Sequence, residues 1–344
     1  MPKARLLPIL KEFGEYPEKY RAMIWKTILK VPQNQIPFTT LLKRGYHSCV
    51  APYAKQYPLA DHKALNNLRK IVSCLAHWSE VFGHVEFLPN FVFPFLKHFK
   101  SDSMACFEVI ASILYNHCQL WFEFVPLQMP YNYLGLIENV LLEFDRNLFE
   151  FYKSKDITAL IYAMPLMETA FSEVFDVQQW LPLWDHIVSN ENYFMIFVIV
   201  AYNIMLRATI MKYDDGDAIE QMFHEQNYVD LRKLVKKSYN LMDKCPNSIH
   251  PKRYMKPFMP LVQGQYQKFT NYPKNLIGIK TNEMKTLKQE QQQLDQKIHQ
   301  LESLDKSINE RMESYVANEE HDKRMKGELY AVVDDYIILM TTNL

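Results

Sequence analysis

The chain contains little glycine, 8 of its 344 residues, where an average protein has about 7%. Because few positions can adopt a positive φ at low cost, glycine-dependent hairpins and phosphate-binding loops are largely excluded. The 18 prolines remain available to start and stop helices. Apolar residues make up 48% of the chain, which excludes a disordered protein. The composition therefore predicts a folded, all-α protein.

Cysteine is also sparse, and its spacing excludes the usual zinc motifs. No two cysteines form a CxxC pair, which structural zinc sites generally need. An odd number of widely spaced cysteines in apolar segments is typical of buried free thiols in a reducing compartment. The five are Cys49, Cys74, Cys106, Cys118 and Cys245. We predict no metal site.

Neither a charge excess nor a long apolar run is present. Lysine and arginine total 39, as do aspartate and glutamate, so nothing indicates nucleic acid as a partner. The longest apolar run, 193–202, is shorter than the roughly 20 residues that span a bilayer. The apolar run in residues 1–13 is too short for a signal peptide. We expect a cytoplasmic protein without a transmembrane segment.

Common catalytic motifs are missing as well. The sequence has no Walker loop, GxGxxG, GxSxG or HExxH motif, so we predict no cofactor. The acidic run 214–217 lacks the later ligands of a calcium loop. It is more typical of a helix start, with Asp217 and Glu220 as a capping box. His117 and Cys118 are neighbours on a predicted helix and point in different directions, which indicates two core side chains.

Residues 1–243 are predicted to form one helical domain. Asp61 begins a helix whose apolar residues recur at three- and four-residue spacing, as expected for one buried face. Residues 31–60 contain four prolines and are predicted to be loop or broken helix.

Residues 244–282 differ sharply in composition from the preceding domain. They contain five prolines, seven lysines or arginines and no acidic residue. We interpret them as an extended basic strap. It either lies across the domain and screens an acidic face, or docks an acidic partner or a membrane surface.

Residues 283–328 have a heptad pattern. One seam is apolar, whereas the other is mixed and includes Gln291 and Asp305. A coiled coil of about four heptads is predicted, and a single charged helix without a partner is the alternative. The predicted core residues are Leu287, Leu294, Ile298, Leu301 and Ile308. Residues 329–344 form a tail with an apolar cluster.

Residues 156–205 contain an unusual order of landmarks. Asp156 is placed to cap a helix, and Pro165 interrupts the next one. Trp180 and Trp184 stand four residues apart, and Asp185 follows directly. This order resembles the C-terminal half of TBC domains. Six residues of the chain match the family's signature positions: Arg21, Trp25, Tyr162, Phe171, Trp184 and Asp185.

The resemblance covers most of residues 1–243 and implies an all-α, TBC-type helical domain followed by a C-terminal coiled coil. TBC domains stimulate GTP hydrolysis by Rab proteins, so a Rab-family GTPase is the implied partner. The strings AHWSEVFGHVEFLPNFVFPFLKHF and YAMPLMETAFSEV resemble members that join a WD-repeat propeller to a TBC domain and lie at centriolar satellites. This chain shows no propeller. The resemblance implies a place at the centrosome, basal body or cilium.

Active family members use two side chains, an arginine in I-x-x-D-x-x-R and a glutamine in Y-x-Q. The arginine motif aligns with residues 49–58, which places Lys55 at the arginine position. The glutamine motif aligns with residues 87–89, which places Pro89 at the glutamine position. Lysine lacks the planar guanidinium group of arginine, which forms paired hydrogen bonds, although it binds phosphate as a point charge.

Three functions remain open from the sequence. The substitutions favour an adaptor with a degenerate Rab-GAP domain that still binds partners, among them a small GTPase. The coil would then recruit a further protein or self-associate. The first alternative is an active GTPase activator that uses Lys55, and the second is a helical spacer that never meets a GTPase.

Overall fold

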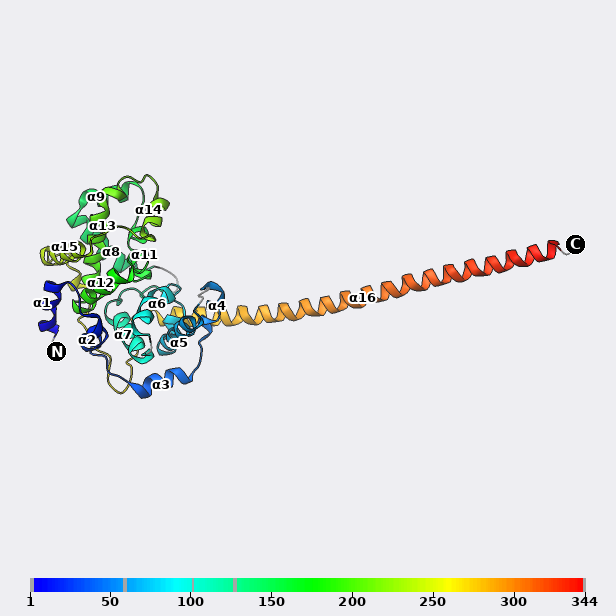
Figure 1. Cartoon of the computed structure of the whole chain (residues 1–344), viewed down its shortest axis with the longest axis horizontal. Coiled ribbons are helices and arrows are strands. Elements are labelled where there is room, and N and C mark those ends of the chain that lie inside the picture. The colour runs from blue at the N-terminus through cyan, green and yellow to red at the C-terminus, as the bar shows by residue number, and fades with distance from the viewer. Residues whose placement is uncertain (1–2, 58–60, 101, 126–128, 343–344) are drawn as a thin grey trace. The chain divides into compact units, whose positions relative to one another are not determined.

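The computed structural model describes residues 3–57, 61–100, 102–125 and 129–342, and every regular element in these ranges is a helix (Figure 1). The prediction of an all-α chain is confirmed. The chain divides into two compact units, residues 1–277 and residues 278–344. We call the first the helical unit.

The helical unit begins with seven α-helices and two short 3-10 turns, which Figure 1 draws from blue to cyan. In chain order they are α1 (Lys3–Phe13), α2 (Glu18–Ile28), α3 (Gln35–Lys43), η1 (Ser48–Val50), α4 (Tyr53–Gln56), α5 (His62–Trp78), η2 (Glu80–Gly83), α6 (Leu88–Phe99) and α7 (Ser103–Asn116). Residues 31–57 therefore form a broken helical stretch, as their prolines indicate.

A second group of helices follows in the same unit, drawn mostly in green. It contains α8 (Tyr131–Phe144), α9 (Arg146–Ser154), α10 (Ala159–Tyr162), α11 (Met164–Glu168), α12 (Val177–Ser189), α13 (Phe194–Ile210), α14 (Gly216–Phe223), α15 (Leu231–Lys244) and η3 (Pro251–Arg253). The two groups are joined by contacts of α12 with α1 and α2, and of α11 with α6.

Aspartates start many of these helices. An aspartate at the N-cap accepts hydrogen bonds from backbone N–H groups that have no partner within the helix. Six helices of the described residues begin in this way, with Asp61, Asp102, Asp145, Asp176, Asp215 and Asp230 as the caps. Asp61 caps α5 as predicted. The cap of α14 is Asp215, so the predicted capping box of Asp217 and Glu220 is wrong by two residues.

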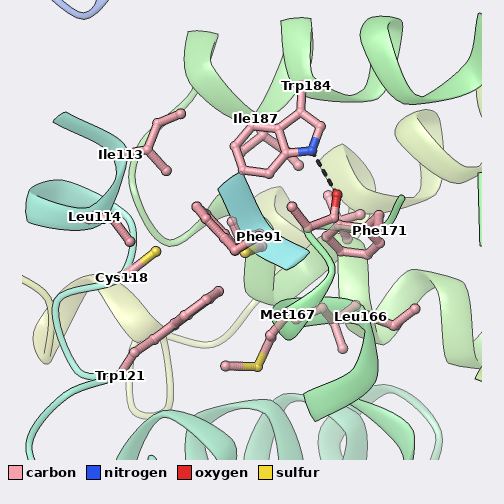
Figure 2. Close-up of a cluster of buried hydrophobic side chains, with 14 of the residues drawn as sticks. Phe91, Ile113, Leu114, Cys118, Trp121, Leu166, Met167, Phe171, Trp184 and Ile187 are labelled. Carbon is pink, nitrogen blue, oxygen red and sulfur yellow. Dashed lines mark hydrogen bonds between the residues drawn. The ribbon is translucent and has the colours of Figure 1, made fainter. Parts of the chain in front are cut away.

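The core is one continuous apolar cluster that includes two almost fully buried helices. Residues 105–114 of α7 and 194–203 of α13 are buried throughout. Helix α13 packs against α8 and α15. Its long apolar run is therefore buried inside the helical unit. Figure 2 shows part of the cluster, where Phe91 of α6, Trp184 of α12 and Trp121 of the turns after α7 approach one another. His117 and Cys118 are both buried, as predicted.

Residues 246–273 of the strap lie across the helical unit and are hydrogen-bonded to it. Asn116 donates to the Met259 carbonyl at 2.9 Å and accepts from the Met259 N–H at 2.7 Å. Gln119 makes the same pair of bonds with Lys256, at 2.9 and 2.8 Å. In the described part of the chain no ion pair joins a strap lysine or arginine to a carboxylate.

One long helix, α16 (Lys274–Thr342), completes the described chain. The last part of the predicted strap is therefore helical rather than extended. The helix continues without a break through the predicted borders at 282/283 and 328/329. None of the helices in the described residues is both long and apolar enough to cross a membrane.

Candidate functional site

A buried ion pair joins α2 to α12. The Arg21 Nε donates to both carboxylate oxygens of Asp185, at 3.1 and 2.9 Å. The Trp25 indole donates to the same carboxylate at 2.6 Å, and the Tyr16 backbone N–H donates at 2.9 Å. The Arg21 Nη2 donates to the Tyr16 carbonyl and to Glu15. Every charged group of the pair thus has several partners, as a buried pair requires.

Burial affects the protonation of the Asp185 carboxyl group in this pair. Asp185 is fully buried, and desolvation raises the pKa of its carboxyl group to about 6, against the opposite effects of Arg21, Tyr16 and Trp25. The structure brings the signature residues Arg21, Trp25 and Asp185 together from positions about 160 residues apart. Their role is to fix the N-terminal helices onto α12, not to contact a nucleotide.

The other tryptophan landmarks serve a sharp turn before α12. The indoles of Trp180 and Trp184 both donate to the Ala170 carbonyl, at 2.8 and 3.0 Å; the bond from Trp184 is the dashed line in Figure 2. Ala170 and Phe171 have φ of +52° and +66°, a region that costs non-glycine residues energy. The two indole bonds and the buried Phe171 ring hold this turn in place.

Tyr162 marks the end of α10 and stacks on Tyr152 with ring centroids 4.4 Å apart. The Tyr152 hydroxyl donates to Asn203 on α13 at 2.8 Å. Helix α10 begins at Ala159 with Thr158 at the N-cap position, so the predicted cap at Asp156 is wrong. Asp156 instead takes a φ of +55° in the turn before the helix.

Lys55, at the expected arginine position, lies on the four-residue helix α4 and is exposed. Its neighbour Tyr53 is buried and meets Tyr57 edge-on at 5.3 Å, which orients the helix. In the described residues no ion pair includes Lys55. Two arginines of the region are engaged elsewhere: Arg44 donates to the His77 carbonyl, and Arg69 lies 4.4 Å over the Tyr46 ring.

The segment that leads to Lys55 lies beside the turn that leads to Pro89. The His47 Nδ1 caps η1 by accepting from the Cys49 N–H at 3.3 Å, and burial lowers the pKa of His47, which keeps this nitrogen free to accept. A Cβ on Gly83 would stand 2.9 Å from the His47 ring. Glycine at position 83 therefore allows η2 to approach η1 closely.

Pro89, at the expected glutamine position, is buried in the first turn of α6. Its ring has no hydrogen-bonding group and its nitrogen carries no hydrogen. The position suits a helix start and offers nothing that could orient a water molecule. No cluster of three metal-ligating side chains occurs in the part of the chain that the structure describes.

A second buried carboxylate, Glu108 in the middle of α7, was not predicted from the sequence. It accepts from the backbone N–H groups of Gln33 and Asn34 at 2.9 and 2.7 Å, and from the Tyr266 hydroxyl at 3.0 Å. Glu108 thus joins the segment before α3 to the strap. The signal was present, because a lone glutamate inside the apolar run of α7 is costly unless it has partners.

Residues 47–211 match the family model described as the Rab-GTPase-TBC domain. The curated relatives include TBC1 domain family member 31 of Xenopus tropicalis, 39% identical over 85% of this chain, and of Homo sapiens, 40% identical over 84%. The chain spans about a quarter of the length of these relatives, 27% in both.

Solved structures share the fold. The Ypt/Rab-GAP domain of Gyp1p has a TM-score of 0.56 and 16% identity, covering 70% of this chain and 92% of that domain. The flagellar RabGAP TBC domain of Chlamydomonas also has a TM-score of 0.56, with 12% identity, covering 68% of this chain and 84% of that one. Residues 47–211 therefore match the Rab-GTPase-TBC family model, and the chain shares the fold of Rab-GAP TBC domains.

Proposed function

We propose that the chain is a TBC-domain adaptor, a degenerate Rab-GAP module that binds partner proteins without accelerating GTP hydrolysis. A Rab-family GTPase is one proposed partner, held by the TBC-shaped surface. The second is a helical protein, or another copy of the chain, held by α16.

Residues 55 and 89 carry this proposal. An arginine finger contributes about 10³- to 10⁵-fold to GTP hydrolysis because its planar guanidinium stabilises transition-state charge. Lys55 offers only a point charge on a short exposed helix. Pro89 is a buried ring without a donor or acceptor in its side chain. A GTPase on this surface would receive neither group, so binding without activation is the expected result.

A single-turnover GTP hydrolysis assay against a panel of Rab proteins tests the proposal. We expect the chain to raise the hydrolysis rate of each Rab by less than about tenfold, because both catalytic groups are replaced. A Lys55→Arg/Pro89→Gln variant, with its fold checked by circular dichroism, tests whether the scaffold accepts the missing groups.

The rival function is an active GTPase activator. It is favoured if one Rab is accelerated more than about a hundredfold and if Lys55→Ala removes that acceleration. Lys43→Ala, another exposed lysine at a helix end, is the matched control and should leave the rate unchanged in either case.

A structural spacer is the third reading, and a pull-down separates it from the adaptor. The adaptor should retain at least one Rab in its GTP-bound form and release it in the GDP-bound form. Retention of partners by residues 283–344 alone, with no nucleotide-dependent Rab binding to the full chain, would favour the spacer.

Helix α16 is proposed to form a coiled coil. Its predicted core residues are 45–64% exposed in the single chain, and a partner helix would bury that surface. They are Leu287, Leu294, Ile298, Leu301 and Ile308. Lys297 and Glu302 lie at flanking positions where the helices of a parallel pair attract one another.

Sedimentation of the full chain tests the coil. We expect association that Leu294→Asp with Leu301→Asp abolishes, because two charges enter the seam. Gln293→Asp with Gln300→Asp adds the same charge on the outer face and should preserve it. If the chain stays monomeric, the same variants test whether a partner captured by residues 283–344 uses the seam.

The proposed location is the cytoplasm at the centrosome, basal body or cilium. This location follows from the sequence resemblance alone. Proximity labelling in a ciliated cell tests this location directly, because the labelled proteins report both where the chain lies and which proteins are near it. Enrichment of proteins from unrelated compartments over centriolar proteins would contradict it.

A further inference from the structure

A groove that does not include Lys55 or Pro89 lies between α5 and α6. It encloses about 550 Å³. One wall is the N-terminal half of α5, where Lys63, Asn67 and Lys70 recur at four and three residues and so share one face. The two helices pack against each other, and the groove follows their junction.

The other wall is the C-terminal half of α6. Phe93, Leu96 and Lys97 stand at positions i, i+3 and i+4 of that helix and line the groove, and Lys100 lines it directly after the helix ends. Phe93 and Leu96 are half-buried, and the Lys97 ammonium group lies 5.2 Å from the centre of the Phe93 ring. The groove therefore has an apolar strip within a basic rim.

Four lysines, Lys63, Lys70, Lys97 and Lys100, line this groove. In the described part of the chain none of them forms an ion pair. Among the described residues that line the groove, Asp61 is the one carboxylate. It caps α5 by accepting from the Lys63 and Ala64 N–H groups at 2.9 and 3.1 Å. Because the whole chain has no net charge, this positive field is local.

We propose that the groove binds an acidic, amphipathic segment of a partner protein. Carboxylates of the segment would pair with the lysines of the two walls, and its apolar side chains would pack on Phe93 and Leu96. A concave site with an apolar strip suits a peptide helix better than a flat bilayer surface. The inference does not depend on Lys55, Pro89 or the coil.

The probe for this proposal is a fluorescein-labelled peptide of about 14 residues, built from glutamate with leucines at helical spacing so that it covers about 20 Å. Fluorescence anisotropy with the full chain should give saturable binding that weakens as salt rises, because the pairs are exposed. Changing Lys63, Lys70, Lys97 and Lys100 to glutamate should weaken binding at least about tenfold. Leu96→Ala should weaken it severalfold.

A matched control changes the exposed lysines Lys19, Lys43, Lys153 and Lys212 to glutamate, with the same change in net charge. This variant should keep at least half of the affinity. Equal loss in both variants would overturn the proposal, because net charge alone would then explain binding. Stronger binding to phosphatidylserine vesicles than to the peptide, lost in the groove variant, would also overturn it in favour of a membrane.

Discussion

Two sets of residues that the family resemblance singles out differ in almost every physical respect. The Arg21–Asp185 pair is buried, and each charge has two hydrogen bonds to other groups besides those within the pair. Lys55 is exposed on a one-turn helix, and Pro89 is buried without a polar side chain. A change in the first set should alter stability, whereas a change at Lys55 should leave stability unchanged.

The largest expected effect follows from removing Asp185. Asp185→Ala leaves the Arg21 guanidinium buried without its main partner, and breaking such a pair costs about 3–5 kcal/mol. Urea unfolding followed by circular dichroism measures the free energy of unfolding. A loss below about 1 kcal/mol would show that the pair is not what holds α2 on α12, and the contrast with Lys55 would fail.

His186, the residue after Asp185, is also buried, and it should make the stability of the protein depend on pH. Burial lowers the pKa of His186 to about 4, whereas an unfolded histidine has a pKa of about 6.5. The unfolded chain therefore binds more protons below pH 6.5, and stability falls as the pH drops from 6.5 towards 4, by about 3 kcal/mol at most. His186→Gln should flatten this part of the stability–pH curve. If the slope of the free energy of unfolding against pH is unchanged between about pH 6.5 and 4.5, His186 is not the source of this pH dependence.

A smaller effect is expected at the strap. Asn116→Ala removes both bonds to the Met259 backbone, and unsatisfied buried polar groups cost about 1–3 kcal/mol. Urea unfolding should show this loss, and proteases should cut residues 246–273 faster. Asn66→Ala, an exposed position on α5, is the control. Equal cleavage of the two variants would mean that the bonds do not hold the strap.

The smallest effect should come from Lys55→Ala. An exposed side chain without an ion pair contributes within about 0.5 kcal/mol to stability. Thermal unfolding of this variant should match that of the unchanged chain. A clear destabilisation would place Lys55 among the structural residues and remove the difference between the two sets.

Much of the fold could be predicted from the sequence, because its signals are local. Apolar spacing located α5, Pro165 marked the break between α10 and α11, and Asp61 marked a helix start. The cap errors at Asp156 and Asp217 have a common cause. Several polar residues precede those helices, and only the folded backbone decides which of them reaches the free N–H groups.

Long-range partners were harder to predict. The strap's proline and lysine content indicated an extended segment, but its path depends on Asn116, Gln119 and Glu108, which lie more than 130 residues away. No short segment of the sequence contains both partners of any of these hydrogen bonds. The resemblance supplied the order of Arg21 and Asp185 but not their hydrogen bonds. The groove between α5 and α6 could not be predicted from the sequence, because it forms only where the two helices pack.

The bonds between Glu108 and Tyr266, and between Asn34 and residues 262 and 264, have a consequence during synthesis. Translation proceeds from the N-terminus, so Glu108 leaves the ribosome well before Tyr266 does. Until then its carboxylate lacks one of its three partners, and the surface beneath residues 246–273 stays open to water and chaperones. Nascent chains of this protein should therefore gain their final protease resistance late, after about 270 residues have emerged.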